Sequence, residues 1–201
     1  MWKFALTLIT ILFVSCGNDS AQEEERAFTD HFIQAATEKD PTVRLKKLES
    51  LMSEGNEYDR YIILGPAAKA ALSSKYYEKA DIYAKKLLKI APKYQDGWNY
   101  GNAIHDGHLV LGRIAVKNGN LEKAIEHLLL AGKTPGSPQL KTFGPNMSLA
   151  NDLLEAGKEK AVIEYFEDCK KFWERNDGRL DSWIASIRGG GKPYFGANLE
   201  Y

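Results

Sequence analysis

The chain lacks the features that mark several common protein classes. It has two cysteines among 201 residues, which excludes a disulfide framework. Its 27 basic residues balance 27 acidic ones, so it lacks the strongly basic surface that is typical of nucleic-acid binding. No G-x-S-x-G, phosphate-loop, Rossmann glycine or paired-cysteine pattern occurs. We therefore predict no catalytic residue, no cofactor and no nucleic-acid partner.

Long apolar runs are also scarce. The one clear case extends from Phe4 to Val14, follows the single charge of Lys3 and precedes the small residue Ser15. A helix needs about 20 apolar residues to cross a bilayer, and this run is much shorter. Its length and flanks are typical of the core of an export signal. We predict that residues 1–15 are a signal peptide and no part of the fold.

The end of this run, L-F-V-S-C, resembles the lipobox of bacterial lipoproteins, in which the cysteine receives the lipid. The resemblance implies that Cys16 is lipidated and becomes the mature N-terminus, and that the protein is anchored to the bacterial cell envelope. Gly17 stands where enterobacterial lipoproteins retained at the inner membrane have Asp, which favours the outer membrane, on its periplasmic face or the cell surface. Residues 16–25 are acidic and are predicted to form a solvated tether. The alternative is that Cys16 is an ordinary residue near a cleavage site.

The rest of the chain has a helical pattern. Apolar residues recur at spacings of three and four, as in Leu45, Leu48 and Leu51, whereas strict alternation over a strand length is hard to find. Prolines and glycines divide the chain into segments of helical length, with Pro41 placed to start one helix. We predict an all-α fold in which short turns make successive helices antiparallel neighbours.

Small and large residues recur with a longer period. From Leu111-Gly112 onward, Ala115, Ala124, Leu128, Ala131 and Pro135 stand at nearly the spacings of the tetratricopeptide repeat, which this segment resembles. Gly112 and Ala124 are predicted to let two antiparallel helices approach closely. Less regular copies are read upstream and downstream, at Ala68, Ala71, Ala80 and Pro92, and at Leu149, Ala150, Leu153, Ala161, Tyr165 and Cys169.

The resemblance implies an α-solenoid of antiparallel helix pairs over residues 60–175. Residues 26–59 are predicted to form N-terminal helices. Residues 176–201 are predicted to form a short helix and a tail that folds back as a cap, because Tyr194, Phe195, Leu199 and Tyr201 are too apolar for a free tail. The segment from Tyr94 to Gly101 is predicted to be an insertion or an extended start of the next helix.

In the repeat family, the inner face is formed by fixed positions of the first helix of each pair. Counted from Leu111-Gly112, with the helix extended backwards, these positions predict a polar stripe of Asn99, Asn102, Asp106, Arg113 and Lys117. Such a stripe suits a peptide backbone or a carboxylate. The alternative is a solvated helix face. Asn146, in a proline- and glycine-rich connection, is predicted to cap the following helix, with a ligand contact as the alternative.

Two histidines lie near the start of the same helix. His105 and His108 are three residues apart, without the spacing of four and the glutamate of a helical zinc motif, so we predict no metal site. The repeat phase predicts that His108 points inward and that Asn102 and Asp106 face the groove. Cys169 lies on an apolar stripe with Phe166 and is predicted to be buried and inert.

Two hypotheses for the function follow. The first is an interaction module, anchored by its N-terminal lipid, that binds a protein or peptide partner at the cell envelope. The alternative is a site that binds a small molecule or a metal, or that catalyses a reaction, formed by Asn102, His105, Asp106 and the Asn146 loop.

Overall fold

The computed structural model describes residues 16–199, and every regular element in that range is a helix. The all-α prediction is therefore confirmed for this part of the chain. In order along the chain the elements are α1 (Cys16–Ala36), α2 (Pro41–Glu54), α3 (Glu57–Ser73), α4 (Tyr77–Ile90), η1 (Ala91–Tyr94), α5 (Tyr100–Lys117), α6 (Leu121–Gly132), α7 (Pro138–Phe143), α8 (Ser148–Glu155), α9 (Glu159–Cys169), α10 (Arg179–Arg188) and η2 (Gly196–Leu199).

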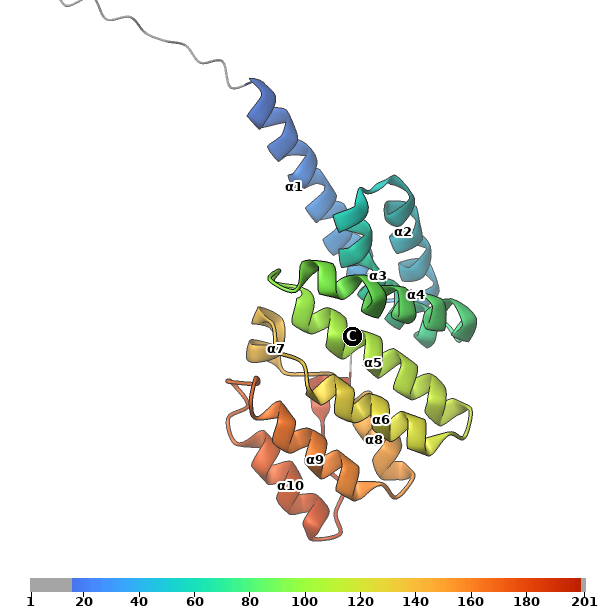
Figure 1. The fold of residues 1–201 in the computed structure, drawn as a ribbon, viewed down its shortest axis with the longest axis vertical. Coiled ribbons are helices and arrows are strands. Elements are labelled where there is room, and N and C mark those ends of the chain that lie inside the picture. Colours follow the sequence, from blue (N-terminus) through green and yellow to red (C-terminus); the bar gives the residue numbers. More distant parts are fainter. Residues whose placement is uncertain (1–15, 200–201) are drawn as a thin grey trace, which may run out of the picture.

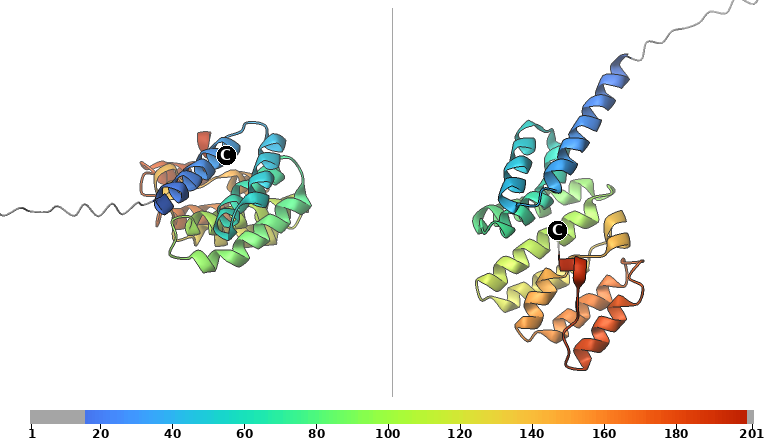
Figure 2. Two further views of the ribbon diagram at one scale, coloured as in Figure 1. Left: turned by 90° about the horizontal axis from the view of Figure 1, so that it is seen from above. Right: turned by 180° about the vertical axis from the view of Figure 1, so that it is seen from behind.

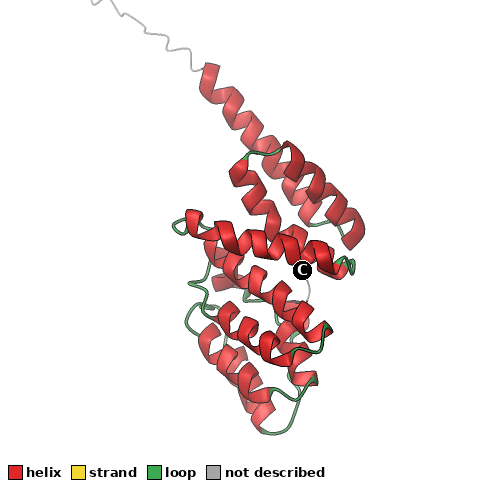
Figure 3. Ribbon diagram, turned by 45° about the vertical axis from the view of Figure 1, so that its right-hand side comes forward, coloured by secondary structure: helices red, strands yellow, loops and turns green. Residues whose placement is uncertain are grey.

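The helices stack in sequence order into an elongated array, with short turns between neighbours (Figure 1). Helix α1 projects from one end, and α9 and α10 form the other. Coloured by secondary structure, the array consists of helices joined by short loops (Figure 3). The helices from α1 to α6 pack mainly against their neighbours along the chain, as expected for a helical repeat, whereas α8 packs mainly on α5 and α6, and α9 mainly on α6.

Local capping explains why the helices begin where they do. The Asp40 side chain accepts from the backbone N–H groups of Thr42 and Val43, and Pro41 occupies the first helical position of α2. Asn56 and Asp59 form a reciprocal capping box at the start of α3. These signals are local in sequence, so the helix starts follow directly from the residues.

Close helix contacts are made at small residues. Gly112 on α5 lies against the Leu149 side chain of α8 and the Cβ of His127 on α6, where an added Cβ would overlap Leu149. Ala124 on α6 is fully buried. The prediction of a close approach is confirmed at Gly112, where a larger side chain would push the helices apart, but the side chains nearest to it are Leu149 and His127 and not Ala124.

The connection between α4 and α5 differs from one sequence expectation. The chain leaves α4 through the short helix η1 and a turn, and α5 begins at Tyr100. Asn99 flanks α5 as its N-cap residue and makes no side-chain capping bond. The helix therefore does not extend back through Tyr94, since η1 and the turn at Gly97 reverse the chain direction first.

The start of the described chain is helical. Helix α1 begins at Cys16, so the acidic segment 16–25, predicted to be a solvated tether, forms its first turns. The predicted signal peptide, residues 1–15, lies outside the described residues. Among the helices that the structure describes, none has both the length and the apolar character needed to span a membrane.

The C-terminal segment returns across the back of the array toward its middle (Figure 2). The Phe195 ring is buried against Phe166 of α9 and Trp183 of α10. The Asn198 side chain donates to the carbonyls of Phe143 and Pro145, at 3.1 Å each. The tail therefore packs on the array through Phe195 and Asn198, whereas Tyr194 and Leu199 are exposed and Tyr201 lies outside the described residues.

Candidate functional site

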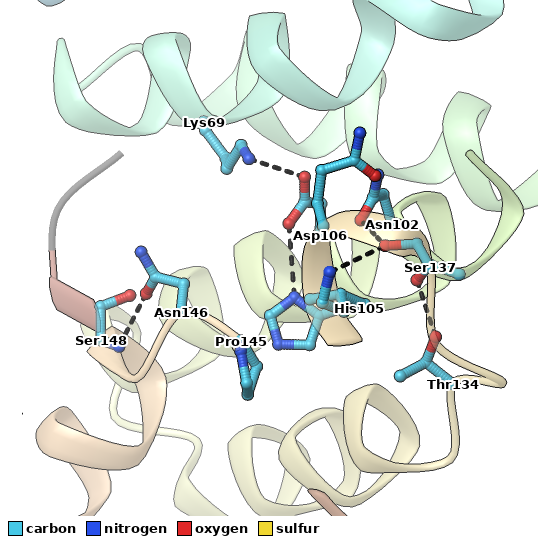
Figure 4. Close-up of polar contacts among 12 residues, drawn as sticks. Lys69, Asn102, His105, Asp106, Thr134, Ser137, Pro145, Asn146 and Ser148 are labelled. Atoms are coloured by element: carbon cyan, nitrogen blue, oxygen red, sulfur yellow. Dashed lines mark hydrogen bonds and ion pairs between the residues drawn. The ribbon is translucent and has the colours of Figure 1, made fainter. Parts of the chain in front are cut away.

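A buried polar network crosses the middle of the array from α3 through α5 to α9, and Figure 4 shows its first part, from Lys69 through Asp106 to His105. The Lys69 ammonium lies 2.7 Å from one carboxylate oxygen of Asp106. The other carboxylate oxygen lies 3.3 Å from Nδ1 of His105, and Nε2 of His105 lies 3.0 Å from the Tyr165 hydroxyl. Because His105 is 0% exposed, it is the histidine of α5 that points fully into the core.

The neighbouring groups determine which nitrogen of His105 carries the hydrogen. Asp106 accepts from Nδ1 of His105, so Nε2 is left to accept from the Tyr165 hydroxyl. Burial raises the pKa of Asp106, but the opposing effects of Lys69 and His105 are larger together and hold it at about 2. The buried carboxylate is therefore ionised and paired, which is the arrangement a folded core tolerates.

This geometry corrects the orientation expected within α5. Asp106 is buried, at 9% exposure, instead of facing an open groove, and His108 is only partly buried instead of being the inward histidine. The reason is that Lys69 of α3 pairs with Asp106, and that Tyr165 reaches His105 from α9, which packs on α6. Since His105 is inaccessible to solvent, the buried network serves to join helices and offers no open site for a ligand.

The two asparagines at the start of α5 hold the connection that follows α6. The Asn102 side-chain nitrogen donates to the side-chain oxygens of Asn99 and Gln139, at 3.0 and 3.2 Å. The Ser137 hydroxyl donates to the Asn102 oxygen at 2.6 Å. Both ends of the Asn102 amide are thus engaged within the protein.

Asn146 lies in the same connection and is buried. Its side-chain oxygen accepts from the backbone N–H of Ser148, the first residue of α8, at 2.7 Å. This bond satisfies one of the free donors at the helix start. Asn146 therefore holds the start of α8 from the position before its N-cap residue, Met147, and its side-chain oxygen is engaged in that bond.

Arg113 and Lys117, in the second half of α5, make different contacts. Arg113 Nε donates to Asp152 of α8 at 2.7 Å, and its side chain is 35% exposed. The Lys117 ammonium lies 4.3 Å from the centre of the Tyr77 ring on α4. The five residues predicted as one stripe therefore have different surroundings: Asp106 is buried, Asn99, Asn102 and Arg113 are half-buried, and Lys117 is exposed.

A second histidine pair was not anticipated from the sequence. Nδ1 of His108 lies 3.0 Å from Nδ1 of His127, and the two rings are tilted by 34°. His127 is on α6, 19 residues further along the chain, so no local motif joins the two histidines. The repeat pattern could have indicated this pair, because it predicts that α5 and α6 pack side by side.

The pair is electrostatically suited to the neutral form. Burial, followed by the nearby charges of His127, His105 and Lys123, lowers the pKa of His108 from 6.5 to about 4, although Glu126 opposes the shift. Burial also lowers the pKa of His127, with contributions from Lys123 and Lys85. Near pH 7 both rings are uncharged, and one Nδ1–H donates to the other Nδ1.

The pair makes the stability of the protein depend on pH. The unfolded chain protonates these histidines near pH 6.5, whereas the folded chain resists protonation of His108 until about pH 4. The free energy of unfolding is therefore expected to fall as the pH falls through this window, by about 1–2 kcal/mol after allowance for solvent screening. Urea denaturation at a series of pH values measures the effect.

The variant His108→Leu should flatten this part of the profile, while His31→Leu, on the exposed face of α1, should leave it unchanged. An equally steep profile in the His108 variant would show that other groups are responsible.

The remaining candidate from the sequence, Cys169, is not accessible to solvent. Cys169 is fully buried, and burial raises the pKa of its thiol. The prediction that Cys169 is buried is confirmed. In the part of the chain that the structure describes, no group of three or more side chains has the spacing of metal ligands.

Comparisons with family models, with curated proteins and with solved structures found no match for this chain.

Proposed function

We propose that the chain is a lipid-anchored protein of the bacterial outer membrane whose helical array binds a protein or peptide partner. The lipobox-like segment ending at Cys16 supports the anchor, and the tetratricopeptide-like pattern over residues 60–175 supports the interaction role. Stacked helix pairs present extended surfaces, which suit elongated partners better than small closed ligands.

The proposal rests on the hydrogen bonds that the Arg113 side chain makes and on those that it leaves open. Its Nε is held by Asp152, which fixes the plane of the guanidinium. The structure records no protein partner for its two terminal nitrogens among the described residues. A guanidinium that is held in place and has free N–H groups can donate hydrogen bonds to a carboxylate or to backbone carbonyls.

The chemistry of the partner follows from the surroundings of Arg113. The exposed Lys117 lies one helical turn further along α5, so the second half of this helix carries positive charge toward solvent. The partner is therefore expected to present a carboxylate, from an acidic side chain or a chain terminus, opposite Arg113. Binding should weaken as ionic strength rises.

The proposal is tested by crosslinking the full-length protein in its native membranes and recovering it by affinity, with mass spectrometry to identify what is bound. Arg113→Glu is expected to reduce recovery of a specific partner at least tenfold, because it places like charges together. Arg188→Glu, an exposed change of the same charge at the end of α10, is the matched control and should recover the partner normally. Equal recovery from both variants would refute the role of Arg113.

A further inference from the structure

A surface hollow at the α1 end of the array is lined mainly by positive charge. It has a volume of about 480 Å³ and lies where α2, α3 and α4 pack together, next to the base of α1 (Figure 1). The residues that line it are Glu49, Met52, Ser53, Arg60, Lys79, Tyr83 and Lys86. Three of these side chains are cations and one is an anion, so the hollow has a net charge of +2 near pH 7.

The anion of the hollow, Glu49, is already paired within the protein. The Lys79 ammonium lies 2.8 Å from one carboxylate oxygen of Glu49, and the Tyr83 hydroxyl donates to the same oxygen at 2.6 Å. Burial raises the pKa of Glu49, but the contacts with Lys79 and Tyr83 together hold it below its usual value. Glu49 and Lys79 therefore compensate each other, and the remaining charge belongs to Arg60 and Lys86.

The Arg60 guanidinium is held at the wall of the hollow by its own helix pair. Its Nε donates to the backbone carbonyl of Met52 at 3.0 Å, which connects the start of α3 to the end of α2. Among the described residues, the structure records no partner for its two terminal nitrogens. Two N–H groups of a guanidinium can donate in parallel to two oxygens of one phosphate group.

Lys86 supplies the second uncompensated charge, from a different helix. Lys79, Tyr83 and Lys86 are four and three residues apart on α4, so they lie along one face of that helix. The Lys86 side chain is exposed, and its ammonium makes no ion pair with any residue that the structure describes. Two like charges in one concave site repel each other, and a bound anion would relieve this repulsion.

We propose that this hollow binds a phosphate monoester group, with Arg60 donating to two of its oxygens and Lys86 to a third. A monoester carries close to two negative charges above its second pKa of about 6, which matches the net charge of the hollow. A carboxylate has one negative charge and two oxygens, so it should bind more weakly. The site lies on α2, α3 and α4 and does not include Arg113 of α5.

The test is titration of the full chain with glycerol 3-phosphate, followed by NMR through the backbone amide of Ser53. One molecule per chain is expected, with acetate at least tenfold weaker. Arg60→Gln and Lys86→Gln should each weaken binding of glycerol 3-phosphate at least tenfold. Lys89→Gln is the matched control, because it removes the same charge from an exposed position of α4 outside the hollow, and it should bind like the unaltered protein.

The pH dependence of binding gives a second readout that needs no variant. Between pH 8 and pH 5, glycerol 3-phosphate gains a proton and loses one negative charge. The groups that line the hollow keep their charges over this range: Glu49 stays ionised, the lysines and Arg60 stay protonated, and burial and Glu49 raise the pKa of Tyr83 to about 12. The affinity at pH 5 should therefore be at least threefold lower than at pH 8.

A last comparison identifies the source of the phosphate group. Dihexanoyl phosphatidic acid carries the same monoester on a soluble lipid. Met52 is the one aliphatic side chain that lines the hollow, so we expect this lipid to bind no more tightly than glycerol 3-phosphate. At least tenfold tighter binding of the lipid would assign the same phosphate site to a lipid headgroup.

Three results would overturn the proposal. The first is no binding of glycerol 3-phosphate. The second is unchanged affinity in Arg60 and Lys86 variants whose circular dichroism shows the unaltered helix content. The third is an affinity equal to that of acetate, or equal at pH 5 and pH 8. One bound molecule per chain, with the stated loss in both variants and at low pH, would support it.

Discussion

Replacing Gly101 with alanine is expected to lower the free energy of unfolding by about 3 kcal/mol or more, one of the largest effects of any single methyl group in this protein. Gly101 lies in the first turn of α5, directly against the backbone carbonyl of Gly136 in the connection after α6. An added Cβ would lie far inside van der Waals contact with that carbonyl. Backbone atoms cannot rotate away as side chains can, so the connection itself must move.

Movement of the connection would break the contacts that attach it to α5. The Thr134 hydroxyl donates to the Gly101 carbonyl at 2.7 Å, and the Ser137 hydroxyl donates to Asn102. Both bonds depend on the close approach of the two backbones at Gly101 and Gly136. The loss therefore combines steric overlap with unpaired buried polar groups, each of which is costly.

Gly65→Ala is the matched control. Gly65 is also a buried glycine inside a helix, but an added Cβ there would make only ordinary contacts, at 3.5 Å or more, with Asp106 and Leu87. Alanine favours a helix over glycine by about 1 kcal/mol, so this variant should be as stable as the unaltered protein or more stable. Urea denaturation followed by circular dichroism measures both. Similar stabilities for the two variants would contradict the proposed close approach.

The helices could be predicted from the sequence because their causes are local. The spacing of Leu45, Leu48 and Leu51 and the cap at Asp40 lie within a few residues of the helix they define. The close approach at Gly112 was predicted in the same way, from a small residue in the repeat pattern, although its nearest side chain, Leu149, comes from α8. Each of these features needs only one or two helices to be recognised.

The candidate sites could not be predicted in full, because their partners come from distant segments. The inward turn of His105 depends on Tyr165, 60 residues away, and the pairing of Arg113 depends on Asp152, 39 residues away. The repeat phase placed His108 inward because it describes one helix pair. It contains no information about α9, which packs on α6 and whose Tyr165 side chain reaches His105.

Asp106→Ala is expected to lower the free energy of unfolding by about 3 kcal/mol, because it leaves two buried donors without their acceptor. The Lys69 side chain is only 18% exposed, and His105 is not exposed at all. The carboxylate of Asp106 contacts both of these side chains. Denaturation at pH 7 measures the loss.

The pH dependence separates this group from the histidine pair. The folded pKa of Asp106 is about 2 and the reference value is 3.8, so its contribution is complete above pH 3.8 and is lost as the pH falls toward 2. In Asp106→Ala this part of the stability profile should become flatter. The window between pH 6.5 and 4, which belongs to His108 and His127, should keep its slope.

A double variant distinguishes a paired charge from a merely well-packed side chain. If the main cost of Asp106→Ala is the loss of the carboxylate that lies against the Lys69 ammonium, then Lys69→Met should restore part of the loss when the two are combined. The expected coupling is about 1–3 kcal/mol. Additive losses would mean that Asp106 acts through His105 alone. The link between α3 and α5 would then rest on apolar packing around Ala67, Ala71 and Val110, and not on the ion pair.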